Sequence, residues 1–77
     1  DNCLENQFKQ YIEANDLFAL RRAVENWSAP DIAALIETLP DGQAVILFRV
    51  LRRQHAAQVF EVLTLKHQQA LIQALAG

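Results

Sequence analysis

A twelve-residue spacing of leucine is the feature that most constrains how this chain folds. In blocks of twelve, residues 28–75 read SAPDIAALIETL, PDGQAVILFRVL, RRQHAAQVFEVL and TLKHQQALIQAL. The fifth, eighth, ninth and twelfth positions are apolar in nearly every block, with Gln68 as the polar exception. Spacings of three, one and three residues place these positions on one face of a helix. The twelfth position is always leucine, at Leu39, Leu51, Leu63 and Leu75.

The twelve-residue period excludes one continuous helix. At about 100° per residue, twelve residues turn the apolar face by roughly 120° beyond three full turns. A continuous helix would therefore carry its apolar stripe around the whole cylinder, which a chain of 77 residues could not bury. We expect each block to be a short helix followed by a turn.

Residue types that cap or stop helices stand at most of the block boundaries. Ser28 followed by Asp31 resembles a capping box. The Pro-Asp-Gly sequence at 40–42 stops one helix and starts the next. Thr64 can cap the last helix. These signals support one helix per block.

One boundary lacks such a signal. The sequence Arg-Arg-Gln at 52–54 contains no residue that breaks a helix. The helices expected at 43–51 and 53–63 are therefore either separate or fused into one.

The chain is predicted to be a single all-α domain, 1–77. Residues 1–27 form an N-terminal helix pair, and residues 28–77 form four repeats. In the N-terminal pair, Asp16 is expected to cap the second helix, and Leu17 is expected to face the core. Short turns make successive helices antiparallel, and a fixed period stacks them into an α-solenoid, or superhelix, of about six helices. Because no initiator Met begins the chain, we expect it to be a fragment of a larger protein.

Composition argues against several classes of protein. The net charge of −2 disfavours a nucleic-acid binder, although the charge is uneven: residues 1–41 carry eight acidic and three basic side chains, and residues 42–77 carry one and four. The longest wholly apolar runs, Ile32–Ile36 and Ala44–Phe48, are too short to cross a membrane. Cys3 is the only cysteine, so no internal disulfide is expected.

Catalytic chemistry is not indicated. Cys3 could pair with His55 or His67, but no third group is placed to orient such a pair. The two histidines share the fourth position of successive blocks, and two ligands fall short of the three or four that transition-metal sites use. We therefore predict that the protein is not an enzyme and that both histidines are solvated.

Acidic residues gather around the helix expected in the first repeat. Asp31, Glu37 and Asp41 are the weak candidates for a metal-binding face, since carboxylates along one edge can help to hold a hard cation when a partner supplies further ligands. Solvation and helix capping explain most of these residues without a metal ion.

Several phrases in their order resemble the cytosolic N-terminal domain of MgtE-type magnesium transporters. They are the phrase from Pro30 to Leu39, the "LFRxL" at 47–51, the "AAxV" at 56–59 and the leucine-rich run from Leu63 to Leu75. The segment EANDLFALRRAVENW before them is similar to the N-terminal helices of that family. The resemblance covers nearly the whole chain.

The resemblance implies a superhelical regulatory domain on the cytoplasmic face of the cell membrane. In that family the domain docks on a pair of CBS modules, shares Mg²⁺ ions with them and so gates a transmembrane pore in a dimeric parent. No tightly bound cofactor, direct membrane insertion or nucleic acid is implied. The family phrase often reads AAEV, and Gln58 stands where that acidic residue faces the partner.

A different class of protein shares the same pattern of short helices. Helical-repeat adaptors, such as the domains of the flagellar motor switch protein, bind other helical domains without an ion. The alternative reading is therefore a protein–protein adaptor of that kind.

Overall fold

The described part of the chain consists of short α-helices. The computed structural model describes the backbone of residues 2–76 and the side chains of residues 6–76. No strand occurs in residues 2–76. The helices are α1 (Asn2–Glu13), α2 (Leu17–Val24), α3 (Ala29–Thr38), α4 (Asp41–Val50), α5 (Arg53–Val62) and α6 (Leu65–Ala76). The predicted all-α fold of about six helices is confirmed.

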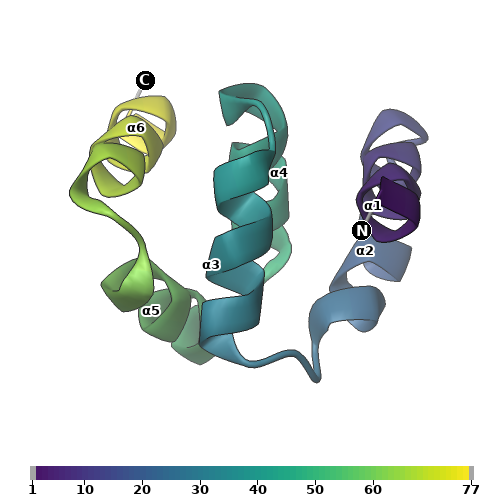
Figure 1. Ribbon diagram of the computed structural model, residues 1–77, viewed down its shortest axis with the longest axis horizontal. Coiled ribbons are helices and arrows are strands. Elements are labelled where there is room, and N and C mark those ends of the chain that lie inside the picture. The colour runs from purple at the N-terminus through teal and green to yellow at the C-terminus, as the bar shows by residue number, and fades with distance from the viewer. Residues whose placement is uncertain (1, 77) are drawn as a thin grey trace.

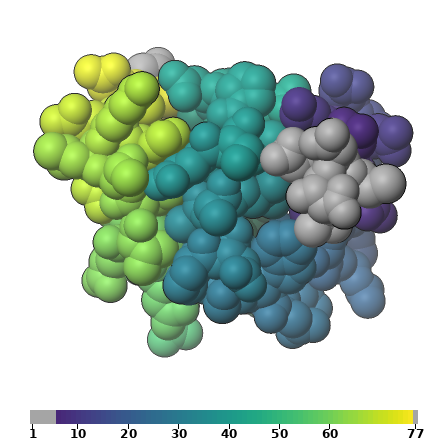
Figure 2. Space-filling view, in the orientation of Figure 1, coloured from purple at the N-terminus to yellow at the C-terminus, as the bar shows by residue number. Residues whose placement is uncertain are grey.

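Helices that are two apart in the sequence pack most closely. The contact of α3 with α5 is the most extensive, and α2 packs on α4 and α4 on α6 (Figure 1). Helix α1 packs on both α2 and α4. The two ends of the chain lie on opposite sides of the molecule, and the space-filling view shows the chain progressing from one side to the other (Figure 2).

The same backbone conformation recurs at the end of α3, α4 and α5. Leu39, Leu51 and Leu63 have extended ψ angles of 150°, 147° and 152°. Each N–H donates to the carbonyl three residues earlier, at 3.2, 3.2 and 3.3 Å. The side chains are 6, 7 and 5 % exposed. The repeated leucine thus lies just beyond the helix, not on its face as the spacing predicts, and anchors the turn in the core.

The residue after each leucine immediately precedes the next helix. Pro40 and Arg52 are extended, with ψ of 152° and 151°. Their carbonyls accept the N–H groups of Ala44 and Ala56, at 2.9 and 2.7 Å. Helices α4 and α5 are therefore separate, although their boundary has no glycine or proline. Burial of Leu51, rather than a breaker residue, stops α4 there.

Helix α2 ends with the same hydrogen bond as the later helices. The N–H of Trp27 donates to the carbonyl of Val24 at 3.0 Å, and the carbonyl of extended Ser28 accepts the N–H of Ile32 at 3.1 Å. Leu20 and Val24 stand twelve residues before Ile32 and Ile36, and all four are fully buried. Residues 16–27 thus show the repeat geometry in a block where Trp27 replaces the leucine at the twelfth position.

The turn between α1 and α2 depends on a left-handed residue. Asn15 has a φ of 58°, a conformation that asparagine tolerates better than most residues. The N–H groups of Asn15 and Asp16 donate to the carbonyls of Ile12 and Tyr11, at 3.0 and 2.9 Å. The Asp16 carboxylate then accepts the N–H of Ala19 at 3.3 Å, which confirms the predicted cap.

The core is formed by apolar residues from all six helices. The ring of Phe8 meets that of Trp27 edge-on, with the ring centroids 5.3 Å apart, and so joins α1 to the end of α2. Three residues that the sequence places on apolar faces are exposed instead, because the surfaces beside them are not covered by any described helix: Leu17, Ile72 and Leu75, at 38, 55 and 41 %.

Leu51→Ala and Leu75→Ala test the role of the buried leucine at one repeat position. The first removes a buried anchor and is expected to cost about 2–5 kcal/mol of unfolding free energy. The second truncates a side chain that is 41 % exposed and should cost less than about 1 kcal/mol. Urea denaturation followed by circular dichroism measures both, and equal losses would contradict the anchoring role.

Gly42→Ala is expected to stabilise the protein. Gly42 lies in the first turn of α4 with a negative φ, and an added Cβ would meet no atom within 4 Å. Alanine restricts the unfolded chain more than glycine does, so the gain should be about 0.5–1 kcal/mol. A lower melting temperature than that of the wild type would show that the turn needs glycine.

Candidate functional site: an acidic edge

The predicted acidic residues lie at two separate places. Asp31 is in the first turn of α3, Glu37 is near the end of that helix, and Asp41 is the first residue of α4. All three are exposed. Glu37 is six positions after Asp31, which is about 9 Å along the helix axis. Glu37 and Asp41 flank the turn at 39–40, and we call these two residues the acidic edge.

Glu37 is held by the start of α6. Its Oε2 accepts the backbone N–H of Thr64 at 3.2 Å. The same oxygen is 4.0 Å from Nδ1 of His67, and this nitrogen is 2.9 Å from the Thr64 hydroxyl. The first N–H groups of a helix lack partners within it, and a carboxylate is favoured there. Glu37 thus stabilises α6 while its carboxylate stays partly open to solvent.

Asp41 and His67 line one small cavity between α3, α4 and α6. Its volume is about 10 Å³, and its walls include Ile36 and Leu71. A space of this size holds at most about one water molecule, so a hydrated cation does not fit inside. The cavity shows instead that Asp41 and His67 face the same junction, which brings both residues of the acidic edge to the start of α6.

The acidic edge supplies only part of a cation site. Within the described residues, no group of three or more His, Cys, Asp or Glu side chains is placed to hold a metal ion. Mg²⁺ requires octahedral oxygen coordination and keeps several of its waters. The chemistry of Glu37 and Asp41 suits outer-sphere contact or one half of a site completed by another surface.

Both histidines are engaged, which corrects the expectation that they are solvated. Nε2 of His55 is 3.0 Å from the carbonyl oxygen of Trp27, and because a carbonyl only accepts, that nitrogen carries the proton. His55 on α5 thereby fastens the turn between α2 and α3. His67 contacts Thr64 and Glu37 as described above. Both histidines are in the first turn of a helix, where their side chains reach residues of a turn. The local sequence does not reveal these contacts.

Two further side chains bind carbonyl groups at helix ends. Nε of Arg21 donates to the carbonyl of Val50 at 2.7 Å. Nε2 of Gln68 donates to the carbonyl of Phe60 at 2.6 Å. The last carbonyls of a helix have no i+4 partner within it. Arg21 supplies a partner for the Val50 carbonyl, and Gln68 adds a second bond at the Phe60 carbonyl, which also accepts the N–H of Leu63. A polar residue at an apolar repeat position, as with Gln68, is the sequence signal that points to such a role.

Gln58 lies away from the acidic edge. It is exposed on α5 and lines an open hollow of about 250 Å³ together with Glu25, Arg52, Gln54 and His55. Neither residue of the acidic edge lines this hollow. A contact between Gln58 and a partner therefore stays a prediction and would involve a different part of the surface.

Most of the chain matches a known protein family. The model of the family described as the MgtE intracellular N domain matches residues 27–76. This range contains the acidic edge, Asp31 and Gln58. No curated protein matches the chain. None of the described helices is long and apolar enough to cross a membrane.

Glu37→Ala tests whether the acidic edge contributes to stability. Loss of the bond to the Thr64 N–H should cost about 1 kcal/mol, because the carboxylate is partly exposed and water replaces it. Glu61→Ala is the matched control: Glu61 is exposed near the end of α5 and has no hydrogen bond or ion pair with the side chains of residues 6–76. Urea denaturation should separate the two variants, and equal stabilities would show that the Glu37 bond contributes nothing.

Proposed function

The chain belongs to the MgtE intracellular N domain family, and we propose that it is a regulatory, non-catalytic domain of a magnesium transporter. In this proposal the domain docks on the CBS modules of its parent chain and senses Mg²⁺ inside the cell. The observation that carries the proposal is the pair of exposed carboxylates at one helix junction, one of which is anchored by α6.

Shared coordination explains how such a surface senses an ion. Two carboxylates bind Mg²⁺ weakly, because the ion gives up its waters reluctantly and needs several well-placed oxygens. When a second acidic surface supplies more oxygens, the ion links two surfaces that otherwise repel each other. The affinity of docking then depends on the concentration of Mg²⁺.

Gating follows from this linkage. A ligand that binds the docked arrangement more tightly than the released one shifts the population toward the docked arrangement. High Mg²⁺ would hold the domain on the CBS modules and favour a closed pore, and low Mg²⁺ would release it. The anchored position of Glu37 supports this role, since a carboxylate fixed before binding loses less side-chain freedom on docking.

Binding between this chain and the CBS region of its parent, measured by calorimetry with and without Mg²⁺, tests the proposal. Mg²⁺ in the millimolar range should strengthen docking. Replacing both Glu37 and Asp41 by their amides should weaken the Mg²⁺-dependent part by about tenfold, since amide oxygens are poorer ligands for a hard cation. Glu61→Gln should behave like the wild type.

Docking of equal strength in Mg²⁺ and in a chelator would overturn the proposal. That result would favour the helical-repeat adaptor, which binds its partner without an ion. If Asp31→Asn, and not the double variant of Glu37 and Asp41, removed the Mg²⁺ dependence of docking, the domain would still be a magnesium sensor. Its ion site would then lie at the other end of α3.

A further inference from the structure

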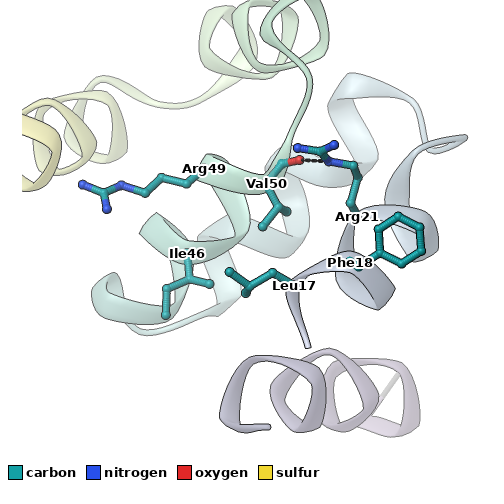
Figure 3. A pocket seen from close by; sticks show the side chains of 6 residues that line it. All are labelled: Leu17, Phe18, Arg21, Ile46, Arg49 and Val50. Carbon is teal, nitrogen blue, oxygen red and sulfur yellow. Dashed lines mark hydrogen bonds between the residues drawn. The ribbon is translucent and has the colours of Figure 1, made fainter. Parts of the chain in front are cut away.

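A second surface of the molecule combines an apolar hollow with positive charge. A cleft of about 450 Å³ opens between α2 and α4, and neither residue of the acidic edge lines it. Leu17 from α2 and Ile46 and Val50 from α4 lie around its centre (Figure 3). This volume falls within the range of about 300–1,000 Å³ that is typical of binding pockets. We call this feature the α2–α4 cleft.

An exposed aromatic side chain stands beside the cleft. Phe18 is 70 % exposed and lines it, although the interior is the usual place for such a residue. The guanidinium of Arg22 lies 5.8 Å from the centre of the Phe18 ring, within the range of a cation–π contact. Exposed apolar groups gathered around a hollow, with polar groups at the edge, are typical of an interaction surface.

The charged groups at the cleft are all arginines. Arg21 and Arg49 line it, and Arg22 contacts Phe18. Within the side chains of residues 6–76, none of the three lies within 4.0 Å of a carboxylate oxygen. Arg21 is fixed by its bond to the Val50 carbonyl (Figure 3). Asp16, which precedes α2, is occupied in capping that helix, and Glu25, three residues after Arg22, lines a different hollow.

We propose that the α2–α4 cleft binds an acidic amphipathic segment of a partner protein. One large apolar side chain of the segment packs on Leu17, Ile46 and Val50, and its carboxylates pair with Arg22 and Arg49. An apolar anchor in a pocket supplies affinity, and complementary charge at its edge supplies specificity. The concave shape favours a projecting side chain over the flat surface of a membrane.

The probe is a synthetic helical peptide of about 15 residues, roughly four turns, with Leu and Phe on one face and Glu on the other. Fluorescence anisotropy measures its affinity for the chain. Arg49→Glu should weaken binding by about tenfold or more, and Arg53→Glu, an equal charge change on α5, should stay within about twofold of the wild type. Phe18→Ala should weaken binding, while Leu65→Ala, which truncates an exposed apolar residue on α6, should not.

Four results would overturn the proposal. The first is that the peptide fails to bind. The second is that both members of each variant pair weaken binding equally, because this indicates a nonspecific effect of charge or hydrophobicity. Alternatively, the chain binds vesicles containing phosphatidylserine but not the peptide, which assigns the cleft to a membrane. Finally, sedimentation reveals self-association that Arg49→Glu abolishes, which assigns the cleft to a second copy of the chain.

Discussion

A helix that must bury the same face again after twelve residues has to stop and restart, because twelve residues advance an α-helix by about 120° beyond whole turns. The chain meets this constraint with a buried leucine in extended conformation and one further residue, after which the next helix begins. Leu39, Leu51 and Leu63 share this geometry. The packing of α3 on α5 and of α4 on α6 depends on it, since each turn sets the direction of the next helix.

Polar side chains then connect the turns to helices that are distant in the sequence. His55 reaches the turn after α2, Arg21 reaches the end of α4, and Glu37 reaches the start of α6. Each of these side chains forms a hydrogen bond with a backbone group at or beside a helix end, where partners within the helix are lacking. Helices of this length are marginal alone, so such contacts, together with the core, make the array one body that can present the acidic edge in a fixed position.

The helices follow from the sequence because their signals are local. The caps at Asp16 and Ser28 and the buried positions of Ile36 and Leu47 are set by residues within one block, and the structure confirms them. The contacts between turns and distant helices cannot be predicted from the sequence, because His55 and Trp27 are 28 residues apart and no local pattern pairs them. The exposure of Leu17 escapes prediction for the same reason: periodicity identifies an apolar face but not whether another helix covers it.

Amide hydrogen exchange, measured by NMR, tests whether the leucine turns are fixed parts of the core. If the turns are fixed, the N–H groups of Leu39, Leu51 and Leu63 exchange only through global unfolding, as slowly as the amides of Ile36 and Leu47 within the buried helices. Fast exchange at these three amides, with the helices still protected, would show that the turns are not part of the core. The helices would then be joined by mobile loops, and the array would not hold its acidic edge in place.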